Sequence, residues 1–301
     1  MKSFDVKAYL AEKRKAVDEA LERFFPPSSG LEKTVVEAAR YSLFAGGKRL
    51  RPILCLAAAE VVDGSQDAVM PAACALEMVH TYSLIHDDLP AMDNDDFRRG
   101  RPTNHRVYGE AVAILAGDLL LTEAFGLLAA PVGSQAALVP AGKRLEAVAI
   151  LARASGAQGM IAGQIIDLES ETREVDLPTV EYMHIRKTGA LISASLEIGA
   201  VFSNASQEAL HALTRYGRHL GLAFQITDDL LDVEGDPQVM GKSTGSDAAK
   251  NKKTYPALLG LGRTKEIARE HVEEAVKALD GFDRKADPLR ALARYLLVRK
   301  A

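Results

Sequence analysis

The 301-residue sequence has no tryptophan and only two cysteines, Cys55 and Cys74. Two cysteines are too few for a disulfide framework, and both lie among apolar residues, so we interpret them as buried small side chains. Neither sign of charge dominates, because 37 Lys and Arg oppose 41 Asp and Glu and leave a net charge of −4. This balance gives no reason to expect a nucleic acid or an anionic membrane as a partner.

Long apolar runs are also rare. The most membrane-like stretch, Ala111–Ala130, contains Asp118 and Glu123, and we interpret it as a core helix rather than a membrane span. Residues Met1–Leu10 lack the apolar centre of a signal peptide, so we expect a cytoplasmic protein. The phosphate loop GxxxxGKS/T is absent, which argues against a P-loop enzyme.

Apolar residues recur at helical spacing throughout, and the alternation typical of strands is missing. No change of composition divides the chain, so we predict one all-α domain over residues 1–301. Asp287 and Pro288 fit the cap and first-turn positions of the last helix. The predicted helices are Asp5–Phe24, Leu31–Leu43, Arg51–Val62, Ala68–Asp88, Gly109–Leu128, Arg144–Gly156, Gly159–Ser170, Thr179–Ala200, Gln207–Asp232, Lys253–Leu259, Thr264–Leu279 and Asp287–Val298.

An acidic cluster follows the largely apolar segment Met78–Ile85. It consists of Asp87, Asp88, Asp93, Asp95 and Asp96. In a straight helix Asp87 and Asp93 would lie on different faces, but Pro90 ends or kinks the helix and lets them converge. Adjacent carboxylates repel unless a cation neutralises them, and an all-oxygen donor set suits Mg²⁺ better than Zn²⁺.

A second cluster, Asp228, Asp229 and Asp232, has spacings of three and four residues that place carboxylates within reach of one another along a helix. Each cluster alone is also typical of a solvated helix end. Two such clusters, each on an apolar helix, favour metal binding.

Basic groups accompany both clusters. They are Lys48, Arg49 and Arg51 after Gly47, Arg98, Arg99 and Arg101 after the first cluster, Lys187 in mid-chain, and Lys242, Lys250, Lys252 and Lys253 in the polar stretch Glu234–Lys253. Carboxylate-bound metal with interleaved Arg and Lys is typical of polyphosphate sites, because the metal bridges some phosphate oxygens and guanidinium groups bind others. The set therefore favours diphosphate binding.

These residues lie in motifs that resemble a known family. The motifs are Gly46 to Pro52 (GGKRLRP), His80 to Asp93 (HTYSLIHDDLPAMD), Arg98 to Gly100 (RRG), Gly163 to Leu168 (GQIIDL), Lys187 to Gly189 (KTG), Phe224 to Asp232 (FQITDDLLD) and Gly241 to Ser243 (GKS). In order and content they resemble the trans-isoprenyl diphosphate synthase family, particularly bacterial farnesyl diphosphate synthases.

The resemblance implies about a dozen helices around a deep central cavity, the isoprenoid synthase type of fold, and a homodimer. It implies a prenyltransferase that condenses isopentenyl diphosphate head to tail with dimethylallyl and geranyl diphosphate, giving the C15 product farnesyl diphosphate. It also implies three Mg²⁺ ions with the substrate bound. Their ligands would come from Asp87, Asp88, Asp93, Asp228, Asp229 and Asp232.

The resemblance gives roles to the remaining residues. Gly47, Lys48, Arg51, His80 and Arg99 would hold isopentenyl diphosphate; Arg98, Lys187 and Lys242 would hold the allylic diphosphate, with Lys252 closing over it; Thr188 and Gln225 would lie against the forming carbocation. His80 precedes Asp87 by seven residues, or two turns, so the spacing independently places both on one helix face. We expect the stretch Glu234–Lys253 to close over bound diphosphate.

Tyr82 and Ser83 concern product length. Tyr82 lies five residues before Asp87, about 7–8 Å along the helix, and a bulky aromatic here acts in the family as a floor that stops growth at C15. Ser83 is too small to block alone. The seven-residue span Asp87–Asp93 also occurs in plant-type geranylgeranyl enzymes, so a C20 product stays open. Remoter alternatives are a metal phosphohydrolase, a class I terpene cyclase and a non-catalytic partner subunit of a heteromeric synthase.

Overall fold

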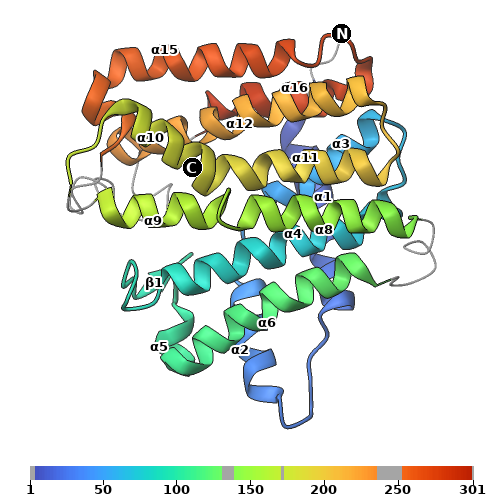
Figure 1. Cartoon of the computed structure of the whole chain (residues 1–301), viewed down its shortest axis with the longest axis vertical. Helices are drawn as coiled ribbons and strands as arrows, with labels where there is room; N and C mark the ends of the chain where they lie inside the picture. The colour runs from blue at the N-terminus through green and yellow to red at the C-terminus, as the bar shows by residue number, and fades with distance from the viewer. Residues whose placement is uncertain (1–3, 131–138, 171–172, 236–252, 300–301) are drawn as a thin grey trace.

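The computed structural model describes residues 4–130, 139–170, 173–235 and 253–299, and in these ranges it is almost entirely helical (Figure 1). The α-helices are α1 (Val6–Phe24), α2 (Lys33–Leu43), α3 (Leu50–Val61), α4 (Gln66–Asp87), α5 (Asn104–Tyr108), α6 (Glu110–Ala129), α8 (Ala141–Ser155), α9 (Met160–Ser170), α10 (Leu177–His184), α11 (Ala190–Phe202), α12 (Gln207–Glu234), α15 (Tyr255–Lys277) and α16 (Asp287–Leu296). The predicted all-α fold class is confirmed, while a single domain over residues 1–301 stays a prediction.

Long helices lie side by side across the molecule, from α15 at one end to α6 and α2 at the other (Figure 1). Two of them form the centre: α4 packs against α3, α6 and α11, and α11 packs against α3, α8 and α12. The apolar run in the first half of α4 is buried, and Cys55 and Cys74 have no exposed surface. Burial raises the pKa of both thiols far above their usual range, which fits their interpretation as core residues.

Several boundaries differ from the predicted ones. The predicted helix Thr179–Ala200 is α10, the π-helix η1 (Ile185–Gly189) and α11 in succession. The two helices predicted before and after residue 260 form one bent element, α15, with Gly260 at φ 74°. Asp287 is the first helical residue and not the cap, because the 3₁₀ turn η2 (Arg284–Ala286) precedes it. The sequence pattern also does not predict the short hairpin of β1 (Phe97–Arg98) and β2 (Arg101–Pro102).

Helix α6 is covered on one side only. By length and composition alone α4 and α6 could cross a membrane, but 83% of the apolar window of α4 is buried, as in a core helix of a globular protein. For α6 the buried share is 39%, and Ile114 and Leu115 are 44% and 56% exposed. The prediction of a core helix over Ala111–Ala130 therefore holds only for the side that packs against α2 and α4.

Candidate active site

The turn after α4 draws the first acidic cluster together. Asp87 ends the helix, and the backbone N–H of Asp93 donates to the carbonyl oxygen of Asp87 at 2.8 Å. Burial raises the pKa of the Asp87 carboxyl to about 6, and the charge of Asp93 adds to this against the opposing pull of Lys187. The chain thus makes the curl predicted around Pro90, and it concentrates negative charge in a partly desolvated place.

Asp88 has a different environment. Its side chain is 4% exposed and pairs with Arg98, whose Nε and Nη2 lie 2.7 and 2.6 Å from Oδ1. Arg98 belongs to the β1–β2 hairpin, and the next residue, Arg99, has the rare φ of 53°. The hairpin therefore brings two predicted diphosphate-binding arginines beside the acidic turn.

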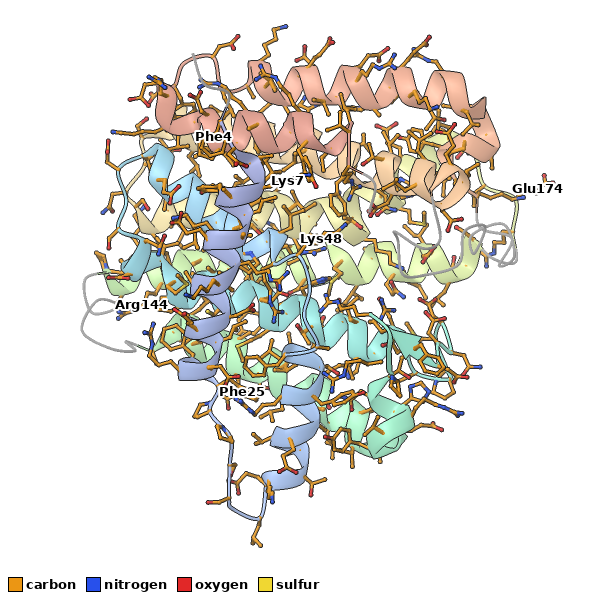
Figure 2. The ribbon with its side chains drawn as sticks, turned by 180° about the vertical axis from the view of Figure 1, so that it is seen from behind. Phe4, Lys7, Phe25, Lys48, Arg144 and Glu174 are labelled. Atoms are coloured by element: carbon orange, nitrogen blue, oxygen red, sulfur yellow. The ribbon has the colours of Figure 1, made fainter. Side chains whose placement is uncertain are left out.

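A glycine turn carries the second basic group. Gly47 has φ 134°, a conformation that residues with a side chain rarely adopt, and a Cβ there would lie 2.8 Å from the guanidinium of Arg99, so the turn favours glycine. Lys48 is exposed, in the middle of the face crossed by α1 (Figure 2), and Arg51 is partly buried with its Nε unpaired. Burial and the surrounding arginines lower the pKa of His80 well below its usual range, so its imidazole is neutral at pH 7.

Lys187 lies in the π-helix, a form that often marks functional sites. Its Nζ is 2.6 Å from Oδ2 of Asp167 on α9. Glycines allow the close packing: a Cβ at Gly163 would lie 2.2 Å from the Lys187 nitrogen, and one at Gly221 would lie 2.7 Å from Cα of Gly189. The π-helix is thus fixed between α9 and α12, which explains the break in the predicted Thr179–Ala200 helix.

The two polar residues predicted near the carbocation contact each other. The Thr188 hydroxyl donates to Oε1 of Gln225 at 2.9 Å, and Nε2 of Gln225 donates to Oδ1 of Asp229 at 3.3 Å. Asp229 is 2% exposed and accepts the backbone N–H of Tyr255 at the start of α15, at 3.1 Å. Asp229 therefore orients Gln225 and anchors α15, in addition to its predicted place in the metal cluster.

Asp228 has a partner from the end of the chain. Nη2 of Arg299 lies 2.6 Å from Oδ1 of Asp228 and 2.7 Å from the hydroxyl oxygen of Thr227. The guanidinium also stacks on the ring of Phe224, at 4.3 Å from the centroid. Asp232, one turn further along α12, is 3% exposed. The second cluster is therefore set by contacts from distant parts of the chain.

The two clusters share one electrostatic environment. The charge of Lys187 acts on Asp87 of the first cluster, and that of Asp228 in the second acts on Arg51. Arg51 in turn lies close enough to His80 to lower its pKa. Both acidic clusters and three of the predicted basic groups, represented by Arg51, Arg98 and Lys187, therefore lie in one region.

Tyr82 is 7% exposed and faces His86, with ring centroids 5.7 Å apart in an edge-to-face arrangement. Nε2 of His86 lies 3.0 Å from the carbonyl oxygen of Ile114 on α6, and a Cβ at Gly117 would lie 2.1 Å from the same nitrogen. The Ser83 hydroxyl donates to the carbonyl of His80, its own preceding turn. His86, which the motif pattern leaves without a role, therefore contacts the Tyr82 ring and connects this turn of α4 to α6.

Part of the predicted site lies outside the described residues. This applies to Lys242, Lys252 and residues 236–252 of the predicted closing stretch. In the parts of the chain that are described, no three His, Cys, Asp or Glu side chains already form a metal-binding group.

Sequence reasoning missed Glu77 and Arg299, and it quoted Asp167 within a motif without giving it a role. Asp167 and Glu77 are acids inside apolar helices, a recognisable signal for a buried ion pair. Arg299 has no such signal, because its partners lie 71 and 72 residues away in the chain.

Comparison with known proteins identifies this arrangement. The family model described as Polyprenyl synthetase matches residues 32–292. The chain is 49% identical over 298 residues to a protein of Fischerella ambigua named dimethylallyltranstransferase, covering 99% of this chain and 84% of that one. It is 48% identical to the chloroplastic geranylgeranyl pyrophosphate synthase of Capsicum annuum, with coverages of 98% and 79%.

Solved structures agree. An FPP/GFPP synthase from Zymomonas mobilis has a TM-score of 0.86 at 38% identity, covering 97% of this chain and 98% of that one. A geranylgeranyl pyrophosphate synthetase from Pyrococcus horikoshii has a TM-score of 0.87 at 32% identity, with coverages of 97% and 99%. The chain therefore belongs to the polyprenyl synthetase family, the trans-isoprenyl diphosphate synthases, which are prenyltransferases acting on isopentenyl and allylic diphosphates.

Proposed function

We propose that this protein is an Mg²⁺-dependent farnesyl diphosphate synthase. It would join isopentenyl diphosphate to dimethylallyl diphosphate and then to geranyl diphosphate. The observation that carries the proposal is the placement of basic groups beside both acidic clusters. Arg98 pairs with Asp88 of the first cluster at 2.6 Å, and Thr188, next to Lys187, reaches Asp229 of the second through Gln225. Carboxylates and cations interleaved in this way suit two diphosphate groups placed side by side.

The donor set fits Mg²⁺. Asp87 and Asp93 converge at one turn, all six predicted ligands are carboxylates, and Mg²⁺ is usually held by one or two carboxylates together with substrate phosphate and water. Three protein ligands are therefore not needed at one position before substrate binds. Bound Mg²⁺ would stabilise negative charge on the departing diphosphate.

The chain's own residues support an ionisation, condensation and elimination sequence. Lys187 and Arg98 would bind the allylic diphosphate while its C–O bond breaks. The Thr188 and Gln225 oxygens would face the allylic cation, and Lys48, Arg51, His80 and Arg99 would orient isopentenyl diphosphate for C–C bond formation. The proton lost in the last step would pass to the released diphosphate, and no Ser-His-Asp set is required.

Tyr82 supports the C15 product. Its ring is buried five residues before Asp87 and packs edge to face against His86, which in turn contacts α6. The second candidate is a geranylgeranyl diphosphate synthase with a C20 product. It is favoured by the name of the 48% identical Capsicum protein.

Product analysis tests the proposal. The protein is incubated with isopentenyl diphosphate, Mg²⁺ and, separately, dimethylallyl, geranyl or farnesyl diphosphate, and the carbon number of the dephosphorylated products is determined. Accumulation of C15, with farnesyl diphosphate not extended, is the expected result. A C20 product would replace the farnesyl assignment with the second candidate. No condensation with any starter would overturn the assignment as an enzyme and favour a non-catalytic partner subunit of a heteromeric synthase.

A homodimer is part of the proposal. Exposed apolar side chains gather on α6, α8 and α9, which are neighbours in the fold: Ile114, Leu115, Leu145, Ile161 and Ile165 are 44–69% exposed. A second copy would cover such a surface. We expect sedimentation to give a dimer and Leu115→Arg to give a monomer. A wild-type monomer would refute this part, and cell fractionation would test the proposed cytoplasmic location.

A further inference from the structure

The loop before α3 has an unusual backbone. Gly46 and Gly47 have φ of 86° and 134°, and Arg49 has φ 50°, a conformation that non-glycine residues rarely adopt. Lys48 and Arg51, two of the predicted diphosphate-binding residues, flank this strained position. A backbone of this kind persists only where surrounding contacts hold it.

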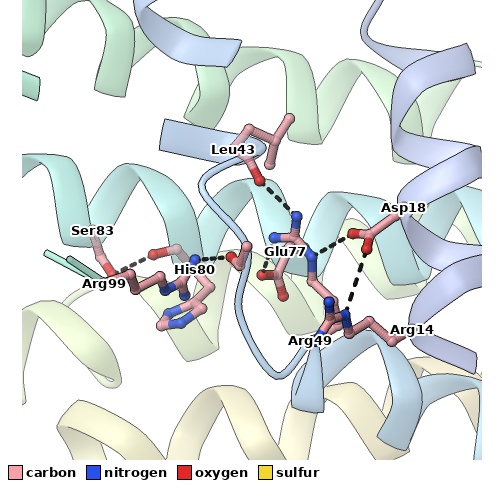
Figure 3. A network of polar contacts seen from close by, with 9 residues as sticks. Arg14, Asp18, Leu43, Arg49, Glu77, His80, Ser83 and Arg99 are labelled. Atoms are coloured by element: carbon pink, nitrogen blue, oxygen red, sulfur yellow. Dashed lines mark hydrogen bonds and ion pairs between the residues drawn. The ribbon is translucent and has the colours of Figure 1, made fainter. Parts of the chain in front are cut away.

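Arg49 makes those contacts, and its partners lie on three helices (Figure 3). Its Nε donates to Oδ1 of Asp18 on α1 at 2.8 Å, its Nη1 to Oε1 of Glu77 on α4 at 2.7 Å, and its Nη2 to the carbonyl oxygen of Leu43 on α2 at 2.7 Å. The Arg49 and Glu77 side chains are only 1% and 2% exposed. The loop is therefore tied to the core by a buried ion pair.

Glu77 is a buried acid close to three arginines, Arg49, Arg51 and Arg99. Besides binding Arg49, its negative charge acts on Arg51 and on Arg99. Its second oxygen, Oε2, is buried and has no hydrogen-bond partner among the described residues. Glu77 also lies one helical turn before His80 on α4. Several arginines this close together would repel one another without a counter-charge.

We propose that Glu77, acting through Arg49, is the positioning residue of the isopentenyl diphosphate site. Its charge fixes Arg49, and Arg49 fixes the backbone that presents Lys48 and Arg51 to the diphosphate group. Glu77 itself does not touch substrate. The inference rests on the proposed function, because it assigns the Lys48 and Arg51 side of the site to isopentenyl diphosphate.

The test is Glu77→Gln, which keeps the shape of the side chain and removes its charge. We expect the KM for isopentenyl diphosphate to rise about tenfold or more, since a buried ion pair is broken beside the ligand. The KM for geranyl diphosphate should stay within about twofold, and kcat at saturating isopentenyl diphosphate within about threefold. Calorimetric binding of isopentenyl diphosphate should weaken in parallel.

Glu60→Gln is the matched control. Glu60 pairs with Lys13 and accepts from the Tyr9 hydroxyl, so this variant also breaks an ion pair that holds α1, but away from the loop. Both variants are expected to melt at lower temperature, and only Glu77→Gln should change the KM for isopentenyl diphosphate. Equal changes in both KM values, or an unchanged KM in a folded Glu77→Gln protein, would overturn the inference.

Asp18→Asn covers the case in which Glu77→Gln does not fold. Asp18 is the outer partner of Arg49, with its side chain 38% exposed. This variant should raise the KM for isopentenyl diphosphate about twofold to fivefold without affecting that for geranyl diphosphate, and no rise would refute the positioning role. Wild-type protein that neither binds isopentenyl diphosphate nor condenses it would instead refute the proposed function.

Discussion

The two acidic clusters reach the same region by different means. The first is made locally: α4 ends at Asp87, the chain curls at Pro90, and the N–H of Asp93 bonds back to Asp87. The second lies within the continuous helix α12, and its environment comes from far along the sequence, through Arg299 on Asp228 and Tyr255 on Asp229. One cluster is shaped by its own turn, whereas the other is shaped by what packs against it.

The difference extends to charge. Asp87 is an acid whose ionised form is disfavoured, because burial raises its pKa to about 6. Asp228 already has a cation at 2.6 Å. A metal ion would therefore relieve repulsion in the first cluster but would have to replace an arginine in the second. This contrast can be tested one residue at a time.

The largest expected effect is the loss of turnover on removing either charge. Asp87→Asn and Asp228→Asn should each lower kcat about 10³-fold or more, roughly 4 kcal/mol of transition-state stabilisation. Asp96→Asn is the matched control in the first loop, because among the described residues its exposed side chain pairs with the exposed side chain of Arg106 at 3.1 Å. Steady-state assays at saturating Mg²⁺ measure this. A full loss for Asp87→Asn with a mild effect for Asp228→Asn would restrict the metal site to the first cluster.

The next largest effect concerns product length, which we expect the part of α4 before Asp87 to set. Tyr82→Ala should lengthen the product beyond C15, because α4 has a buried aromatic ring behind its acids. Gly117→Ala should do so partly, since its Cβ would displace His86 from its contact with that ring. Gly126→Ala, on the same helix but facing open space, is the control. Chromatography of the dephosphorylated products gives the answer, and unchanged C15 from Tyr82→Ala would show that the floor lies elsewhere.

The local character of the first cluster explains why it could be predicted. Pro90 and a six-residue separation were enough to infer that Asp87 and Asp93 converge, and helical periodicity located most of the elements. The π-helix at Lys187 could not be inferred, because it depends on close packing of Gly163 and Gly221 from other helices. Arg299 escaped prediction for the same reason.

The role of each arginine in a motif also depends on tertiary contacts that sequence spacing does not reveal. Arg98 reads as a diphosphate ligand from its motif, yet it also neutralises Asp88. Arg49 shares its motif with two predicted diphosphate-binding residues but is buried in the core. Sequence patterns find which residues are special, and packing decides which of them face the substrate.

A smaller effect is expected from removing the partner of Asp228. Arg299→Ala should lower the Mg²⁺ concentration needed for half-maximal activity by about fivefold, since an ion pair worth roughly 1 kcal/mol would no longer compete for the carboxylate. Arg284→Ala is the control, because that side chain is 84% exposed and only weakly paired with Asp287 at 3.8 Å. An unchanged or higher Mg²⁺ requirement would mean that Arg299 does not oppose metal binding.

The smallest effect is on stability without metal. The pKa of Asp87 is about 6 in the folded protein and about 3.9 in an unfolded chain. Because the folded-state value is the higher one, ionised Asp87 destabilises the fold fully above pH 6, and this cost disappears as pH falls towards 4. Asp87→Asn should therefore raise the metal-free melting temperature at pH 8 by a few degrees, which corresponds to at most about 3 kcal/mol.

The same measurement separates the two clusters. Asp228→Asn breaks the ion pair with Arg299, so it should lower the melting temperature at pH 8 where Asp87→Asn raises it. At pH 4.5 the advantage of Asp87→Asn over wild type should be largely gone, because wild-type Asp87 is then protonated. Calorimetry in a chelating buffer gives both curves. If both variants lose stability at pH 8, the charge of Asp87 is already compensated without metal, and the contrast between a strained cluster and a paired one fails.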